Sequence, residues 1–215
     1  MRSAVDPKTW VESHLVRVSQ SSFLITGNTG LVIAIDPFSA FPAGTKADII
    51  LITHDHPDHF NAARVRSLLR AGTRIVVPAS MKVSGREKGL ATDAMLPGET
   101  REIGQLTLTT VRAYNLNKPM HPLSKGYVGY VLSLDGVRLY HAGDTDLIPE
   151  MSGLKADVAL LPVGGLATMN ARSAAEAARL IGAKVVVPMH YGKVPFSGGA
   201  GQKFAALFQG VTVLL

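Results

Sequence analysis

The chain contains a series of short apolar runs that predict buried β-strands. Each run is rich in valine, isoleucine and leucine and stops abruptly at glycine, proline, histidine or aspartate. Unbroken apolar runs of this length are typical of strands covered on both faces, because neither face then meets water. The segments with this pattern are residues 31–38, 47–56, 73–80, 137–144, 156–165 and 183–192.

Other patterns lie between these runs. Residues 60–72 carry apolar positions at helical spacing and stop at a glycine, and residues 170–182 begin at an asparagine cap and end at a glycine. Both patterns predict helices. Residues 14–30 and 105–114 alternate in part between apolar and polar positions, which is typical of half-exposed antiparallel strands. Together these elements predict a mixed α/β sandwich.

Length and composition restrict this picture further. A chain of 215 residues can form one sizeable core but is short for two ordinary domains and a linker, so we expect a single domain over residues 1–215. A hydrophobic content of 47% excludes a disordered chain. No run reaches the roughly 18 apolar residues that span a membrane, and the first residues lack the pattern of a signal peptide. We therefore expect a soluble, cytoplasmic protein without a membrane span.

Positive charge gathers in one stretch of the chain. The net charge is +6, and between Arg64 and Lys88 the only acidic residue is Glu87, so this stretch accounts for the whole excess. We interpret it as a solvated helix face, with an acidic or nucleic-acid partner as the alternative. No aromatic residue lies among these cations to stack on bases, so we expect no nucleic-acid partner.

The candidate chemistry depends on histidine and carboxylate. The chain has no cysteine, which excludes disulfides and thiolate ligands. The polar residues stand where the predicted strands end, and in layered α/β folds ligands bind beyond the carboxyl ends of strands. We therefore expect the functional site at that edge.

The strongest local signal is the sequence THDHPDH at residues 53–59, between a predicted strand and a predicted helix. Residues two apart on an extended chain project to the same side, so His54 and His56 can converge on one metal ion. Asp58 and His59 follow the bend at the proline and can face a second ion nearby. Imidazole and carboxylate suit zinc, iron and manganese. The motif therefore predicts a metal site.

This motif is similar to the H-x-H-x-D-H signature of the metallo-β-lactamase superfamily. The similarity extends in family order to Asp36-Pro37, Gly143-Asp144-Thr145 and Pro188-Met189-His190-Tyr191. It implies a four-layer αβ/βα sandwich around one or two metal ions. The segments IDPF, YHAGDTD and PMHYG most resemble compact metal-dependent hydrolases grouped near the ascorbate-lactone hydrolase and the N-acyl phosphatidylethanolamine phospholipase D. Nothing resembles a β-lactamase proper, whose second site typically uses a cysteine.

The resemblance also implies roles for individual residues. It assigns the first metal to His54 and His56, the second to Asp58, His59 and His190, and the bridging position to Asp144. Asp58 is also the candidate catalytic residue. A bound metal lowers the pKa of its water to about 7, so a metal-bound hydroxide can attack a carbonyl or phosphoryl centre. We expect two divalent ions, zinc first, with manganese or iron as alternatives.

Two further residues complete the predicted centre. Asp36 is expected to lie behind the ligands and to orient a ligating histidine, with a role as the cap of the following turn as the alternative. Relatives commonly supply a third histidine for the first metal where this chain has Asn115. His121, in a proline-flanked loop, is our candidate replacement. Water and His141 are the alternatives, and His141 is otherwise expected to pack or hydrogen-bond at its strand end.

Two loops are candidates for the mouth of the site. The predicted loop 115–130 carries Lys118, His121 and Lys125, which can receive an anionic substrate or simply be solvated. The turn at residues 164–170 precedes a helix whose N-terminus can bind an anion or be an ordinary capped start. Many relatives have a Gly-His pair where this chain reads Ser-Gln-Ser-Ser at residues 19–22, so any substrate role of that histidine does not transfer.

We therefore expect a hydrolase of a small or medium anionic ester, lactone or phosphodiester. One alternative is a nuclease, although nucleases of this superfamily usually carry a clamping domain for which 215 residues leave no room. The other alternative is a metal-bound ligand sensor without turnover.

Overall fold

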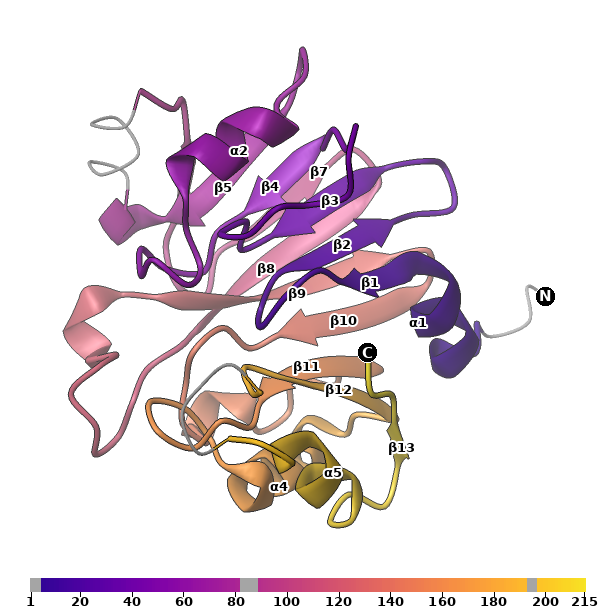
Figure 1. The fold of residues 1–215 in the computed structure, drawn as a ribbon, viewed down its shortest axis with the longest axis vertical. Helices are drawn as coiled ribbons and strands as arrows, with labels where there is room; N and C mark the ends of the chain where they lie inside the picture. The colour runs from indigo at the N-terminus through magenta and orange to yellow at the C-terminus, as the bar shows by residue number, and fades with distance from the viewer. Residues whose placement is uncertain (1–4, 82–88, 193–196) are drawn as a thin grey trace.

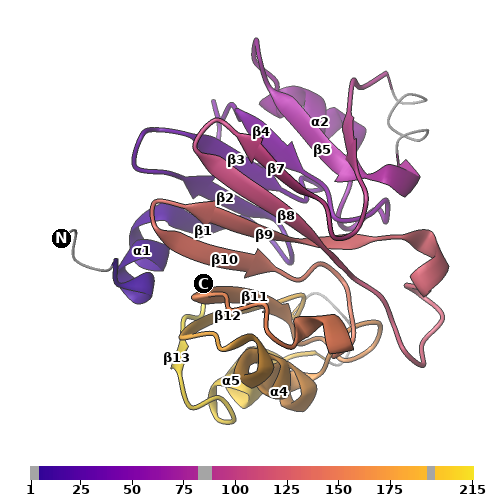
Figure 2. The same ribbon diagram turned by 180° about the vertical axis from the view of Figure 1, so that it is seen from behind.

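The computed structural model describes residues 5–81, 89–192 and 197–215. Within them, two β-sheets pack face to face with helices on their outer faces, as Figures 1 and 2 show from opposite sides. The layers run from α2 through the first sheet and the second sheet to α4 and α5. The predicted four-layer αβ/βα sandwich is confirmed.

The first sheet has the strand order β1-β2-β3-β4-β5-β6. Its strands are β1 (Leu15–Arg17), β2 (Phe23–Thr26), β3 (Val32–Ile35), β4 (Ile49–Leu51), β5 (Arg74–Pro78) and β6 (Asp93–Met95). Pairing is antiparallel from β1 to β3 and parallel from β3 to β6. The helices on this side are α1 (Pro7–His14), α2 (Ala62–Leu68) and the short 3₁₀ helix η1 (Ala79–Met81).

The second sheet has the order β13-β12-β11-β10-β9-β8-β7. Its strands are β7 (Thr100–Ile103), β8 (Leu106–Arg112), β9 (Val128–Leu134), β10 (Val137–His141), β11 (Val158–Pro162), β12 (Val185–Met189) and β13 (Val211–Thr212). Pairing is antiparallel from β7 to β10 and parallel from β10 to β13. Its helices are η2 (Leu123–Lys125), η3 (Pro149–Met151), α4 (Ala171–Ile181) and α5 (Ala200–Ala205).

The core lies between the sheets, and strand alternation builds it. In β3, Ile33 and Ile35 join the central cluster, whereas Ala34 between them packs with α2 on the outer face. This is the two-residue period of a strand, and both faces are buried, which explains the continuous apolar run in the sequence. On the other side, Ala174 and Phe204 bring α4 and α5 onto the second sheet.

The predicted elements are present, with corrections at their ends. Helix α4 is capped by Asn170 and closed by Gly182 in a left-handed conformation, as its sequence predicts. Helix α2 stops at Leu68, before the predicted glycine. The predicted loop 115–130 is shorter than expected, because β9 already begins at Val128.

Part of the basic stretch lies on the surface, as predicted. Arg64, Arg66 and Arg70 are exposed, and Arg70 forms an ion pair with Asp48. Its residues 82–88 lie outside the described part of the chain. Among the described residues, no helix combines the length and apolar character needed to cross a membrane.

Candidate metal centre

The candidate ligands gather where parallel strands end. His54 follows β4, Asp144 follows β10 and His190 follows β12, while His121 lies in the loop between β8 and β9. The first sheet supplies the THDHPDH motif and the second sheet supplies the other three side chains. The site therefore forms across the seam between the two sheets.

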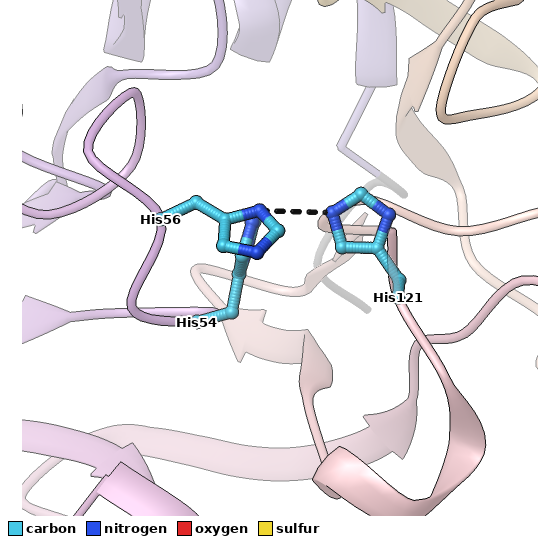
Figure 3. Close-up of side chains that lie close together, drawn as sticks. All are labelled: His54, His56 and His121. Carbon is cyan, nitrogen blue, oxygen red and sulfur yellow. Dashed lines mark hydrogen bonds between the residues drawn. The ribbon is translucent and has the colours of Figure 1, made fainter. Parts of the chain in front are cut away.

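His54, His56 and His121 form a compact group in which the candidate ligand atoms all lie within 4.8 Å of one another. Figure 3 shows His121 facing the two motif histidines from the opposite side. Nε2 of His121 lies 3.2 Å from Nδ1 of His56. The loop thus brings His121 to the place that its predicted role requires.

Asn115 and Ala167 hold His121 in this orientation. The backbone N–H of His121 donates to Oδ1 of Asn115 at 3.1 Å, and the Asn115 N–H donates to the His121 carbonyl at 2.7 Å. Nδ1 of His121 lies 3.1 Å from both the Asn115 Oδ1 and the Ala167 carbonyl, which are acceptors, so Nδ1 carries the hydrogen. Its Nε2 is thereby left with a lone pair toward the centre. Asn115 thus holds His121 in an orientation that faces the other candidate ligands.

A second group consists of Asp58, His59 and His190, again with ligand atoms within 4.8 Å. Asp144 lies between the two groups. Its Oδ1 is 3.2 Å from Nε2 of His59, and its Oδ2 is 3.0 Å from Nε2 of His190 and 3.5 Å from Nε2 of His121. Asp144 therefore has the placement that a bridging carboxylate needs.

Asp36 contacts His59 from behind. Its buried Oδ2 accepts a hydrogen bond from Nδ1 of His59 at 2.7 Å, and both carboxylate oxygens accept from Thr53, through its N–H at 2.7 Å and its hydroxyl at 2.8 Å. The side chain is thus bonded to the ligand loop, as predicted, rather than to the turn at Pro37. Asp36 has a φ of 47°, a left-handed conformation that is costly for a residue with a Cβ and is typical of functional sites.

Burial and mutual charge shift the pKa values in the cluster in opposite directions. Burial lowers the pKa of His54 and His121. Burial also acts to lower the pKa of His190, but the charge of Asp144 and its hydrogen bond outweigh this and raise the value to about 9. Burial acts to raise the pKa of Asp144, yet the charges of His190 and His59 hold it well below its usual range. The centre thus keeps its carboxylates ionised.

These residues fit a metal ion. His59 donates its Nδ1 hydrogen to Asp36, so its Nε2 faces Oδ1 of Asp144 at 3.2 Å with no hydrogen of its own in the neutral ring. Two acceptors this close require a cation between them, either a proton or a metal. Nε2 of His54 is buried without a hydrogen-bond partner, at a cost of about 1–3 kcal/mol that a metal would remove. The imidazole and carboxylate donors suit zinc, manganese and iron.

Gln20 is a site residue that the sequence did not reveal. Its Nε2 donates to Oδ2 of Asp58 at 2.9 Å and lies 2.9 Å from Nε2 of His190. The departure from the relatives' Gly-His pair marked this segment, but not which residue of it reaches the centre. Tyr127 was missed as well, and its hydroxyl donates to Asp55 at 2.8 Å and fixes the motif.

His141 lies apart from the candidate ligand groups. Its Nε2 donates to the Ser21 carbonyl at 3.1 Å, and its Nδ1 accepts from the Gly143 N–H at 3.2 Å. It is fully buried and makes the strand-end hydrogen bonds that were expected as its structural role.

At both candidate anion mouths the structure shows hydrogen bonds within the chain. The ammonium group of Lys118 is bonded to Asp146 and, at 2.9 Å, to the Thr168 carbonyl, so it serves the loop rather than an incoming anion. The N-terminus of α4 is bonded by its own cap, because Asn170 accepts from the N–H groups of Arg172 and Ser173. This is the ordinary capped start.

A pocket of about 280 Å³ opens over the cluster. Its lining consists of Gln20, His56, Asp58, Met120, His121, Asp144, Gly164, Leu166, Ala167, Thr168 and His190. The ligand atoms are thus reachable from solvent through a pocket sized for a small molecule or one part of a larger one.

The family model of the β-lactamase superfamily domain matches residues 15–190, which contain both sheets up to β12 and all the candidate ligands. The chain belongs to the metallo-β-lactamase superfamily. A metal-dependent hydrolase of Methanoregula boonei is 36% identical over 188 residues, covering 83% of this chain and 82% of the relative. Another, of Thermococcus onnurineus, is 34% identical and covers 88% and 89%.

A solved structure agrees with these relatives. A metallo hydrolase of Ignicoccus hospitalis is 27% identical, with a TM-score of 0.77 and 94% of both chains covered. The prediction of a metal-dependent hydrolase of the metallo-β-lactamase superfamily is therefore confirmed at the level of the family.

Proposed function

We propose that this protein is a two-metal hydrolase that cleaves an ester, lactone or phosphodiester of small or medium size. Zinc is the metal that we propose first, with manganese or iron as alternatives. The observation that carries the proposal is the position of Asp144, whose two oxygens reach histidines of both ligand groups. His54, His56 and His121 would hold the first ion, Asp58, His59 and His190 the second, and Asp144 both.

The metals, when bound, supply an activated water near neutral pH and withdraw charge from the attacked group. The chain supplies the rest. Asp36 and Ala167 hold the Nδ1 hydrogens of His59 and His121, so that both rings keep their Nε2 lone pairs toward the centre.

Asp58 has the placement of a residue that also meets substrate or water. It lines the pocket, and 43% of its side chain is exposed. Burial acts to raise the pKa of Asp58, but the hydrogen bond to His190 and the charge of His59 lower it to about 2. The carboxylate is therefore ionised at neutral pH, and its oxygens can accept a hydrogen bond from the attacking water. Gln20 donates to the same carboxylate and fixes its orientation.

The test is hydrolysis of bis(p-nitrophenyl) phosphate and of a lactone panel by protein stripped of metal and reloaded with zinc or manganese. We expect turnover that depends on metal and is abolished in Asp144→Asn. Tight binding of panel compounds without turnover would instead indicate a sensor. Cleavage of nucleic acid in a parallel assay, without turnover of the panel, would indicate the nuclease alternative.

A further inference from the structure

The residues that line the pocket over the metal positions are of two kinds. One kind consists of the candidate ligands and Gln20. The other includes Met120 from the β8–β9 loop together with Leu166 and Ala167 from the loop before α4. We call Met120, Leu166 and Ala167 the apolar wall. Met120 is 53% exposed and Leu166 is 67% exposed, so both present large apolar surface to whatever enters the pocket.

Hydrogen bonds hold the two loops that carry the apolar wall in place. The Asn115 amide donates to the Ala167 carbonyl at 2.9 Å, and the Lys118 ammonium donates to the Thr168 carbonyl at 2.9 Å. These bonds tie the two loops together beside the pocket. Apolar side chains beside a few polar groups in a pocket are typical of ligand sites, whose linings are predominantly hydrophobic.

Charge along the pocket agrees with an apolar ligand. Among the described residues that line it, none is a lysine or arginine. Lys118, the cation expected at this mouth, is directed to Asp146 instead. Within the described lining, positive charge for an anionic group therefore comes from the metal positions, and the part of the substrate that extends along the apolar wall meets no lysine or arginine of that lining.

We propose that the substrate carries an aliphatic group beside its scissile bond and that Met120 and Leu166 bind this group. The inference rests on the proposed function, because it takes the reacting group to lie over the metal positions. It narrows the substrate class to aliphatic esters, lactones or phosphodiesters, and it makes these two residues determinants of specificity.

The test uses hydroxamic acids, which chelate zinc through two oxygens and leave the alkyl chain free to lie on the apolar wall. Acetohydroxamate, butyrohydroxamate and hexanohydroxamate are titrated into zinc-loaded protein by calorimetry. Each methylene that becomes buried contributes about a fourfold gain in affinity, so we expect the dissociation constant to fall steadily along the series.

Two variants test whether Met120 and Leu166 cause the dependence of affinity on chain length. In Met120→Ser/Leu166→Ser the dependence on chain length is expected to flatten, with zinc content measured in parallel to show that the centre is intact. Leu180→Ser is the matched control, because Leu180 is also exposed, at 46%, but lies near the far end of α4. In this control the chain-length dependence should match that of the unaltered protein.

The outcomes separate this inference from the proposed function. Affinity that is independent of chain length, or a dependence that survives in the double variant, would overturn the aliphatic site while panel turnover still supported the hydrolase. Failure of every hydroxamate to bind to protein that holds its zinc would also overturn it. Absence of turnover across the panel, with chain-length-dependent binding, would overturn the hydrolase and retain the site.

Discussion

In His59 and His121, the two ring nitrogens have different roles: Nδ1 is fixed by a hydrogen bond, and Nε2 faces the other candidate ligands. In His59 and His121 the Nδ1 hydrogen is donated to a fixed oxygen, on Asp36 in one case and on Asn115 and Ala167 in the other. Fixing one nitrogen decides which way the other faces, so the protein orients the ring before any metal arrives. We therefore expect metal affinity to depend partly on residues that would never contact the ion.

His121→Ala is expected to lower metal content from about two ions per chain toward one. The variant removes a nitrogen donor from the first position while the second position keeps Asp58, His59 and His190. The measurement is elemental analysis after dialysis against metal-free buffer. His14→Ala is the control, because His14 is bonded to Trp10 and Asn28 outside the ligand groups. Full metal content in His121→Ala would favour a first position completed by water.

The metal-free protein is expected to lose stability as the pH rises from about 6.5 through about 9. The pKa of His190 is raised to about 9 in the folded protein, against 6.5 as its ordinary value. Because the pKa is raised on folding, the proton on His190 stabilises the folded state. This contribution is fully present below pH 6.5 and is lost as the pH rises through the pKa of the folded protein. It amounts to up to ~3 kcal/mol. Urea midpoints across this range measure it, and zinc-loaded protein should show a flatter profile.

At the scale of secondary structure, the ends of the strands bring the candidate metal ligands to one edge of the two sheets. A close contact between two neighbouring loops then fixes the position of His190. Gly164, after β11, lies against the end of β12, where a Cβ on it would stand 2.4 Å from the His190 carbonyl. Because backbone cannot yield as a flexible side chain does, this contact requires glycine. His190 itself has a φ of 57°, so the end of β12 is held in a strained conformation at the centre.

Gly164→Ala is therefore expected to displace His190, lowering both metal content at the second position and the free energy of unfolding by about 1–3 kcal/mol. Elemental analysis and urea denaturation measure the two effects. Gly198→Ala is the matched control, because no atom lies within 4 Å of the Cβ position there. Equal behaviour of the two variants would contradict the close-contact explanation.

Sequence patterns predicted the elements whose determinants are local. Most buried strands and α4 carry their own signals in apolar runs and caps, whereas α1, α5 and the buried strand β9 were not predicted. Helix α1 buries only Trp10 and Val11, and α5 spans six residues with Gly201 inside it, so neither shows a clear helical period. Strands β6 and β13 are too short to show a pattern of their own, and they form by pairing with neighbouring strands.

The candidate site also contains residues that have a local sequence signal and residues that have none. The motif at residues 53–59 is contiguous, and chemistry pointed to His121 as the nearest spare histidine. Gln20 and Leu166 carry no such mark, because only the packing of loops far apart in the sequence brings them to the pocket. Whether Lys118 faces an anion could not be decided from the sequence for a related reason, because its partner Asp146 lies 28 residues away.

At the scale of the whole molecule, the two sheets follow one plan. In each, antiparallel strands precede parallel ones, and the change occurs at β3 in the first sheet and at β10 in the second. Asp36 directly follows β3, and Asp144 follows β10. The two aspartates thus occupy equivalent positions in the two sheets, and such points are where open α/β sheets place their ligands.

Because the ligands come from both sheets, a metal ion bound among them would act as a cross-link in a chain that has no disulfide. It would tie residues 54–59 to positions 121, 144 and 190, closing loops whose ends must otherwise meet at an entropic cost. Separation of the sheets then requires that metal ligands be released first. Chelation is therefore expected to accelerate unfolding in urea, measured by stopped-flow fluorescence of Trp10, while Asp144→Asn unfolds at one rate with or without chelator. The same ions that serve hydrolysis would thereby set the lifetime of the folded chain.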